Sequence, residues 1–328
     1  MPSALPRILA AVALGGAALW ATHRRAKGRA EAAHAAFPAQ GRMVTVRGRR
    51  VHAVQAGEGP DLVLIHGASG NLRDLTFDLL PRLAPRFRVT AFDRPGLGWT
   101  DGAPGRAFTS AAESPQDQAA LLRDAARALG IRRPILLGHS FGGIVALAWA
   151  VAHPAEVCAV VSLAGVAMPW SEPMSLFYKV NGSALGGTLA TPFIAAYAGP
   201  RAVHAALRGI FHPDPVPEGY AEAVGTPLTL RLDQLRANAR QVRSLLPHVR
   251  ALARAYPALT VPVEIVHGDA DTIVPIAIHS LPLLDVLPTA RLTVLPGVGH
   301  MPHHAAPEAV VAAVDRAASR CREAPPPP

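Results

Sequence analysis

One serine has the surroundings of an enzymatic nucleophile. Ser140 lies in Gly138-His139-Ser140-Phe141-Gly142, which matches the pattern G-x-S-x-G. The apolar run Ile135-Leu136-Leu137 precedes the pattern, and an apolar helical segment follows it to about His153. A serine on a tight turn between a buried strand and a helix is held in a strained, accessible position, and glycines allow the close backbone contacts of such a turn. A helix-capping serine is the plainer alternative, and the strand before it favours the nucleophile.

A serine hydroxyl becomes a useful nucleophile only beside a base that accepts its proton. His300 ends the segment Gly297-Val298-Gly299-His300, directly after a strand predicted at 292–295. His303 and His304 have the same chemistry but lie further along, toward the last helix. We therefore assign the base to His300 and expect the other two histidines on a loop or at a pocket rim.

The base needs an acceptor that fixes its tautomer and stabilises the imidazolium. Asp271 follows a strand predicted at 263–266, within His267-Gly268-Asp269-Ala270-Asp271. Asp269 competes on residue type, and we expect it to bond the backbone of its own turn instead. The chain order Ser140, Asp271, His300 agrees with this assignment.

The negative charge that develops during acyl transfer requires backbone N–H donors. Phe141, directly after the nucleophile, supplies one such amide. The second should come from the loop His66-Gly67-Ala68-Ser69-Gly70-Asn71, and we choose Ala68, although its neighbours could serve instead. His66 is expected to be a structural residue of this loop.

The elements that must position these groups alternate between strands and helices. Strands are predicted at 43–46, 51–54, 62–65, 88–92, 135–137, 157–163, 263–266 and 292–295, and helical patterns at 71–84, 115–129, 141–153 and 307–318. This alternation predicts a mostly parallel sheet with helices on both faces and functional groups at the carboxyl ends of the strands. The proline-rich stretch 168–256 breaks the alternation and is interpreted as an inserted cap.

The positive charge of the chain is concentrated at its N-terminus. Of a formal net charge of +9, residues 1–50 contribute nine Lys/Arg against the single acid Glu31. The folded body therefore lacks the basic face of a nucleic-acid-binding protein.

Residues 8–22 are uncharged and largely apolar, with Arg7 before them and a basic cluster after them. We predict a segment 1–29 made of a hydrophobic membrane anchor, with residues 5–22 as the membrane contact, and a basic flank. The positive-inside rule then predicts a cytoplasmic catalytic domain. A cleaved signal peptide, which would make the protein secreted or periplasmic, and a soluble arm are the alternatives.

The C-terminus and the two cysteines carry less information. Residues 321–328 are predicted to be a disordered, proline-rich tail. Cys158 is expected to be a small buried apolar residue, and Cys321 lies in the polar tail. A disulfide between the two depends on geometry that the sequence leaves open.

Five signatures together resemble the α/β-hydrolase superfamily over residues 43–320. They are His66-Gly67-Ala68-Ser69-Gly70, Asp93-Arg94-Pro95-Gly96-Leu97-Gly98, Gly138-His139-Ser140-Phe141-Gly142-Gly143, His267-Gly268-Asp269-Ala270-Asp271 and Gly299-His300. The resemblance implies an α/β-hydrolase fold, Asp271 at the acid position, a cap at about 168–256 and an enzyme without cofactor or metal. Dehalogenases and epoxide hydrolases of this superfamily carry aspartate where this chain has Ser140.

The resemblance implies hydrolysis of a carboxylic ester through an acyl-enzyme on Ser140. The same triad also serves perhydrolases related to cofactor-free haloperoxidases, carbon–carbon bond hydrolases and acyltransferases, and a non-catalytic binding protein is the alternative from another class. We expect a small, apolar acyl substrate and leave the oligomeric state open. The cap side chains that either line its pocket or hold the cap together are Trp170, Met174, Phe177, Tyr178 and Phe193.

Overall fold

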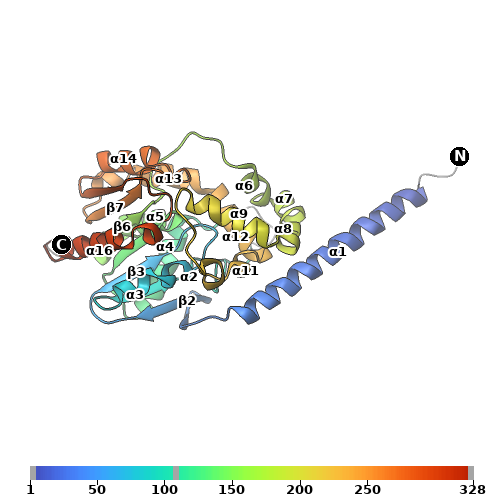
Figure 1. Ribbon diagram of the computed structural model, residues 1–328, viewed down its shortest axis with the longest axis horizontal. Coiled ribbons are helices and arrows are strands. Elements are labelled where there is room, and N and C mark those ends of the chain that lie inside the picture. The colour runs from blue at the N-terminus through green and yellow to red at the C-terminus, as the bar shows by residue number, and fades with distance from the viewer. Residues whose placement is uncertain (1–4, 106–110, 324–328) are drawn as a thin grey trace.

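The computed structural model describes residues 5–105 and 111–323. Figure 1 shows a central sheet covered by helices, a group of helices beside it, and one long helix that projects away from the body. Within the described residues the sheet has eight strands in the order β1-β2-β4-β3-β5-β6-β7-β8. The strands are β1 (Arg42–Val46), β2 (Arg49–Ala56), β3 (Asp61–Ile65), β4 (Arg88–Phe92), β5 (Ile135–His139), β6 (Ala159–Leu163), β7 (Val263–Gly268) and β8 (Ala290–Leu295).

The sheet is parallel except at one edge. β1 and β2 form an antiparallel hairpin whose turn residues Arg47 and Gly48 both have positive φ, as a two-residue turn of this kind requires. β2 pairs antiparallel with β4, and every later pairing is parallel. The mostly parallel sheet predicted from the sequence is confirmed. Its parallel strands bring their carboxyl ends to one edge.

Helices cover both faces, because the central strands are apolar on both sides. In β3, Val63 and Ile65 pack with α4 (Pro115–Ala128) and α5 (Phe141–Ala152). Leu62 and Leu64 point to the other face, against α3 (Leu79–Leu83) and α16 (Pro307–Glu323). Continuous apolar strands are typical of sheets buried on both faces. The remaining helices of the main domain are α2 (Arg73–Phe77), α14 (Ile276–Val286) and α15 (Pro302–Ala305).

The single helix predicted over 71–84 is wrong, since the structure divides it into α2 and α3. Asp78 between them has φ −134° and ends the first helix. Pro81 explains the break: it has no N–H to donate to the preceding turn, so it fits only in the first turn of a new helix. The predicted helix at 115–129 is confirmed, and Ser114 and Asp117 form its capping box.

The predicted cap is confirmed as a helical insertion over residues 176–253, between β6 and β7. It contains α6 (Leu176–Asn181), α7 (Ala184–Leu189), α8 (Thr191–Tyr197), α9 (Pro200–Phe211), α10 (Tyr220–Ala223), α11 (Thr226–Thr229), α12 (Leu232–Arg243) and α13 (Leu245–Ala253). Phe177 and Phe193, predicted as possible pocket lining, are 42% and 49% exposed. They point outward, because α6 and α8 turn other faces toward α12.

The N-terminal segment forms one helix, α1 (Leu5–Ala36), and only its second half packs on the body. Arg25 and Arg29 donate to the carbonyl of Ala196, and Arg29 also donates to that of Ala198, at the end of α8. Figure 1 shows the first half extending free of the body. In the described ranges no helix combines the length and the apolarity needed to cross a membrane, so the predicted anchor is not found there as a membrane-spanning helix.

The prediction for residues 321–328 is partly wrong. α16 continues to Glu323, and Cys321 is buried in it rather than lying in a tail. Cys321 forms a disulfide with Cys158, with Cα atoms 5.3 Å apart, so Cys158 is not simply a small apolar residue. Residues 324–328, the rest of the predicted tail, lie outside the described residues.

Candidate active site

Ser140 occupies the sharp turn between β5 and α5. Its backbone angles, φ 52° and ψ −117°, lie in a region that non-glycine residues rarely adopt. The turn is held because Ser140 N–H donates to Leu163 (2.9 Å) and its carbonyl accepts from Val166 (3.1 Å). A Cβ on Gly142 would collide with the carbonyl of Ile65, which explains the glycine there. The backbone is strained at the residue whose hydroxyl would react.

Asp271 and His300 are in direct contact. His300 Nδ1 lies 2.7 Å from Asp271 Oδ2. The other oxygen, Oδ1, accepts the N–H groups of Ile273 (2.8 Å) and Val274 (2.9 Å). Although burial alone would raise it, the pKa of Asp271 is held well below its ordinary value by hydrogen bonds, including those from His267 and His300. The carboxylate is therefore charged at neutral pH and can orient His300.

His267 is a positioning residue that sequence reasoning did not identify. Its Nε2 faces two acceptors, Asp271 Oδ2 (3.1 Å) and the carbonyl of Val274 (2.7 Å), so this nitrogen carries the proton. Its Nδ1 accepts from the Ser280 hydroxyl at 2.6 Å. The sequence feature that could have identified His267 is its place in the motif that contains Asp271, where no role was assigned to it.

Ser140 and His300 are brought to neighbouring positions through His139. His139 Nε2 lies 2.9 Å from the carbonyl of His300, and the two rings are 5.0 Å apart. Within the described chain no hydrogen bond joins the Ser140 hydroxyl to His300. Such a bond often tightens only when substrate binds. Asp269 accepts the N–H of Gly297 (2.7 Å), so it braces the loop before His300 rather than its own turn.

The two amides predicted to form the oxyanion hole flank Ser140. Phe141 is the first residue of α5, so its N–H has no acceptor within the helix. A Cβ built on Gly67 would lie 3.2 Å from the Ser140 Cβ, which places the loop containing Ala68 against the nucleophile. This loop is tied to α12, since Ser69 N–H donates to Asn238 Oδ1 and Asn238 Nδ2 donates to Ser69 Oγ, both at 2.8 Å.

The expectation that His303 and His304 lie at a rim is wrong for both side chains. Both imidazoles are buried against Asp74, which also accepts from the Tyr220 hydroxyl at 2.8 Å. Burial alone would raise the pKa of Asp74, but the two histidines hold it well below its ordinary value. Two histidines and a carboxylate are donors that suit a divalent transition metal. In this structure the Nε2 atoms of both histidines contact Asp74, while Nδ1 of His303 is buried without a hydrogen-bond partner.

Ser140 is largely closed off from solvent. Ser140 is 7% exposed. A cavity of about 830 Å³ lies elsewhere, between α1, α12 and the segment after β4, with Trp99 and Ala237 in its wall. None of the three residues Ser140, Asp271 and His300 lines this cavity.

Comparison with known proteins identifies the family. The model of the "Alpha/beta hydrolase family" matches residues 62–313. An uncharacterized protein of Mycobacterium tuberculosis is 30% identical over 83% of this chain and 79% of its own length. A 2-hydroxymuconate semialdehyde hydrolase of Pseudomonas sp. is 29% identical over 80% of this chain and 88% of its own. The crystal structure of a membrane phospholipase A, a bacterial virulence factor, has the same fold, with a TM-score of 0.66 over 98% of both chains at 20% identity. With Ser140 on its strained turn and the family model matching most of the chain, the protein belongs to the alpha/beta hydrolase family.

Proposed function

We propose that the protein is a serine hydrolase that cleaves carboxylic esters through an acyl-enzyme on Ser140. The observation that carries this proposal is the strained turn at Ser140 together with the Asp271–His300 pair. Family membership supports hydrolysis. The serine nucleophile supports an ester substrate, because a Ser-His-Asp set and backbone oxyanion donors serve acyl transfer to a hydroxyl.

The reaction would proceed in two acyl transfers. Ser140 Oγ attacks the ester carbonyl while His300 Nε2 accepts its proton, and Asp271 stabilises the resulting imidazolium. The N–H groups of Ala68 and Phe141 bind the carbonyl oxygen as it becomes an oxyanion. His300 then protonates the leaving alcohol. Water, deprotonated by His300, then attacks the acyl carbonyl. The bond to Ser140 Oγ breaks, His300 returns the proton to Oγ, and the carboxylic acid leaves.

A carbon–carbon bond hydrolase is the second candidate function. The similarity to a 2-hydroxymuconate semialdehyde hydrolase over most of both chains favours it. The same three residues could serve both reactions, so the fold alone does not choose between them.

Labelling with a fluorescent fluorophosphonate and hydrolysis of p-nitrophenyl acetate, butyrate and octanoate test the proposal. Wild type should be labelled and active, and Ser140→Ala should lose both, whereas the exposed-site control Ser175→Ala should match wild type. Turnover of 2-hydroxymuconate semialdehyde without ester hydrolysis would select the second candidate. A folded wild type that neither labels nor turns over any of these substrates would contradict both and favour a binding protein.

We further propose that the protein associates with a membrane surface through the N-terminal half of α1. The supporting observation is that the side chains of Ile8, Leu9, Val12, Leu14 and Trp20 are each 57–71% exposed. Cationic residues, including Arg24 and Lys27, follow them on the same helix and would attract anionic headgroups.

Flotation with anionic and neutral lipid vesicles tests this association. Wild type should float with anionic vesicles, and Leu9→Ser combined with Val12→Ser and Leu14→Ser should not. Leu281→Ser, which removes an exposed apolar side chain elsewhere, is the control. Wild type that stays in solution with both vesicle types would refute the association.

A further inference from the structure

Arg94 is a buried cation without an acidic partner. It is the second residue after β4, in the Asp93-Arg94-Pro95-Gly96 motif, and its side chain is fully buried. Its Nη1 donates to the amide oxygens of Gln118 (2.8 Å) and Gln241 (3.0 Å). Among the described residues no carboxylate lies within ion-pair distance of it. Burial lowers the pKa of Arg94 to about 9, which leaves it charged at neutral pH. Such an arrangement costs stability, so a functional reason for it is expected.

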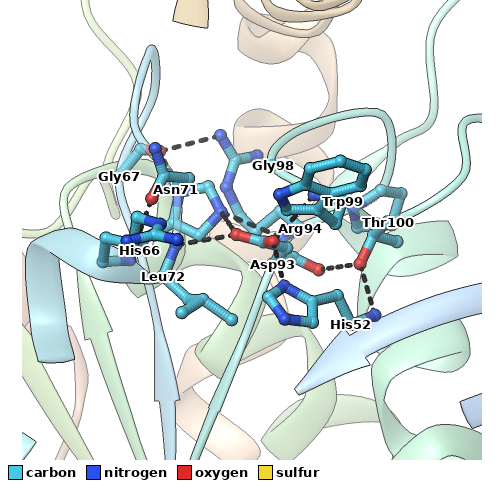
Figure 2. A network of polar contacts seen from close by, with 12 residues as sticks. His52, His66, Gly67, Asn71, Leu72, Asp93, Arg94, Gly98, Trp99 and Thr100 are labelled. Atoms are coloured by element: carbon cyan, nitrogen blue, oxygen red, sulfur yellow. Dashed lines mark hydrogen bonds and ion pairs between the residues drawn. The ribbon is translucent and has the colours of Figure 1, made fainter. Parts of the chain in front are cut away.

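The third hydrogen bond of the guanidinium leads to the candidate oxyanion hole. Arg94 Nη2 donates to the carbonyl of Gly67 at 3.1 Å, and Figure 2 shows the two groups joined across the loop. The carbonyl of Gly67 and the N–H of Ala68 belong to one planar peptide unit. Holding the carbonyl therefore fixes the direction in which the Ala68 N–H points.

His66 adds a second donor to the same carbonyl. Its Nε2 accepts the backbone N–H of Arg94 at 2.9 Å, so its proton is on Nδ1, which donates to the Gly67 carbonyl at 2.8 Å. Burial, together with the nearby Arg94 charge, lowers the pKa of His66 to about 4, so the ring is neutral. Two donors on one carbonyl polarise the peptide and make its N–H a stronger donor.

Asp93 fixes the backbone from which Arg94 extends. Its Oδ1 accepts the N–H of Leu72 (2.7 Å), and its Oδ2 accepts the N–H of Trp99 (2.8 Å) and contacts His52 Nδ1 (2.6 Å). Figure 2 shows this carboxylate at the centre of the network. A side chain on Gly98 would collide with it, which accounts for the second glycine of the motif. The hydrogen bonds of Asp93 therefore leave the backbone of Arg94 little freedom of position.

Arg94 also contacts the residue that supplies the other amide. The guanidinium carbon lies 4.2 Å from the centre of the Phe141 ring, in cation–π geometry. The same side chain thus holds the Gly67–Ala68 peptide and packs on Phe141.

We propose that Arg94 is a positioning residue that orients and polarises the oxyanion-hole peptide Gly67–Ala68 and holds Phe141 beside it. This inference rests on the proposed acyl transfer at Ser140. The positive charge of Arg94 is fixed in a buried site, so Arg94 favours the oxyanion over the neutral ester. Loss of Arg94 should therefore lower kcat and leave KM for the ester nearly unchanged.

The test compares Arg94→Met, Arg94→Lys and wild type, with Arg231→Met as the matched control. Arg231 is also buried and donates to carbonyls, but to those of Gly98 and Leu228 rather than Gly67. We would measure kcat and KM for p-nitrophenyl butyrate per active site counted with fluorophosphonate, and the affinity for an alkyl boronic acid, which forms a tetrahedral adduct with serine.

Arg94→Met should lower kcat by about tenfold to a hundredfold, less than the loss of a direct donor causes, with a similar loss of boronate affinity. Arg94→Lys should recover part of both, and Arg231→Met should resemble wild type. Equal kcat per labelled site in Arg94→Met and wild type, or equal losses in the Arg231 control, would overturn the inference.

Two further outcomes are informative. If Arg94→Met does not fold, Gln241→Leu removes one acceptor that positions the guanidinium, and an unchanged kcat there would overturn the inference. A wild type that is neither labelled nor active would instead overturn the proposed function, and this inference with it.

Discussion

The carboxylate of Asp271 receives hydrogen bonds from two backbone amides and two histidines, His267 and His300. Asp269, two residues earlier, accepts a single backbone N–H from the loop before His300. At the scale of single residues, this difference separates the residue that orients the base from one that supports a loop. It also shows why the pKa of Asp271 is depressed despite its burial.

Asp271→Asn should lower kcat for p-nitrophenyl butyrate by about a thousandfold to ten-thousandfold, because an amide nitrogen facing His300 imposes the wrong tautomer. Asp269→Asn keeps an oxygen for Gly297 and should remain within about twofold of wild type. Steady-state kinetics on both variants, with folding checked by circular dichroism, measures this. Equal losses in the two variants would reject the assignment of the acid.

At the scale of elements, buried polar contacts connect segments that are far apart in the chain. Asn238 of α12 bonds Ser69, which couples the cap to the loop that would supply an oxyanion donor. Asp93 connects the end of β4 to β2 through His52. Both ring nitrogens of His52 face acceptors, Asp93 Oδ2 and the carbonyl of Gln40, so the charged imidazolium satisfies both.

The His52–Asp93 pair should make stability depend on pH. Burial lowers the pKa of His52, but Asp93 raises it, and the net pKa is raised. The charged His52 therefore contributes to the free energy of unfolding in full below about pH 6.5. This contribution is lost as the pH rises through the pKa of His52 in the folded protein. Burial raises the pKa of Asp93, but His52 lowers it, and the net pKa is lowered. The Asp93 carboxylate therefore contributes to the free energy of unfolding in full above about pH 3.9. This contribution is lost as the pH falls through the pKa of Asp93 in the folded protein.

The free energy of unfolding should therefore differ most between wild type and His52→Gln from about pH 4 to pH 6.5, by roughly 1–3 kcal/mol. Urea unfolding across this range and beyond it measures the difference. The exposed His204→Gln is the control. A difference that stays constant with pH would show that His52 is not charged in the folded protein.

At the scale of the whole molecule, the Cys158–Cys321 disulfide attaches the end of α16 to the segment before β6, across 163 residues of sequence. α16 covers one face of the sheet, so the bond secures the last helix of the main domain. Disulfides persist mainly in oxidising compartments. We therefore propose that the catalytic domain is exported, the alternative to the cytoplasmic location predicted from the basic flank of α1.

Cys158→Ser combined with Cys321→Ser should lower the free energy of unfolding by about 2–5 kcal/mol, because the crosslink restricts the unfolded chain. Urea unfolding of the variant and of wild type, with and without reductant, measures the effect. Reductant should destabilise only wild type. Two free thiols in protein purified from its native host without reductant would contradict both the bond and the exported location.

Local patterns in the sequence determined the order of strands and helices, the cap, the turn at Ser140 and the choice of His300 and Asp271 as partners. These features depend on apolar periodicity, glycine and proline positions and chain order, all of which can be read from neighbouring residues. The helix at 115–129 was predicted for the same reason, whereas the break at Asp78 shows that apolar spacing alone can hide a proline effect.

Only the tertiary structure decided the roles that arise from contacts between distant segments. It buried His303 and His304 against Asp74, paired Cys158 with Cys321, and aimed Arg94 at the carbonyl of Gly67. The physical reason is that a polar side chain gains its role from the partner it meets when buried, and packing of remote elements selects that partner. Local propensity acts over a few residues, so it does not predict which distant residue a buried side chain will contact.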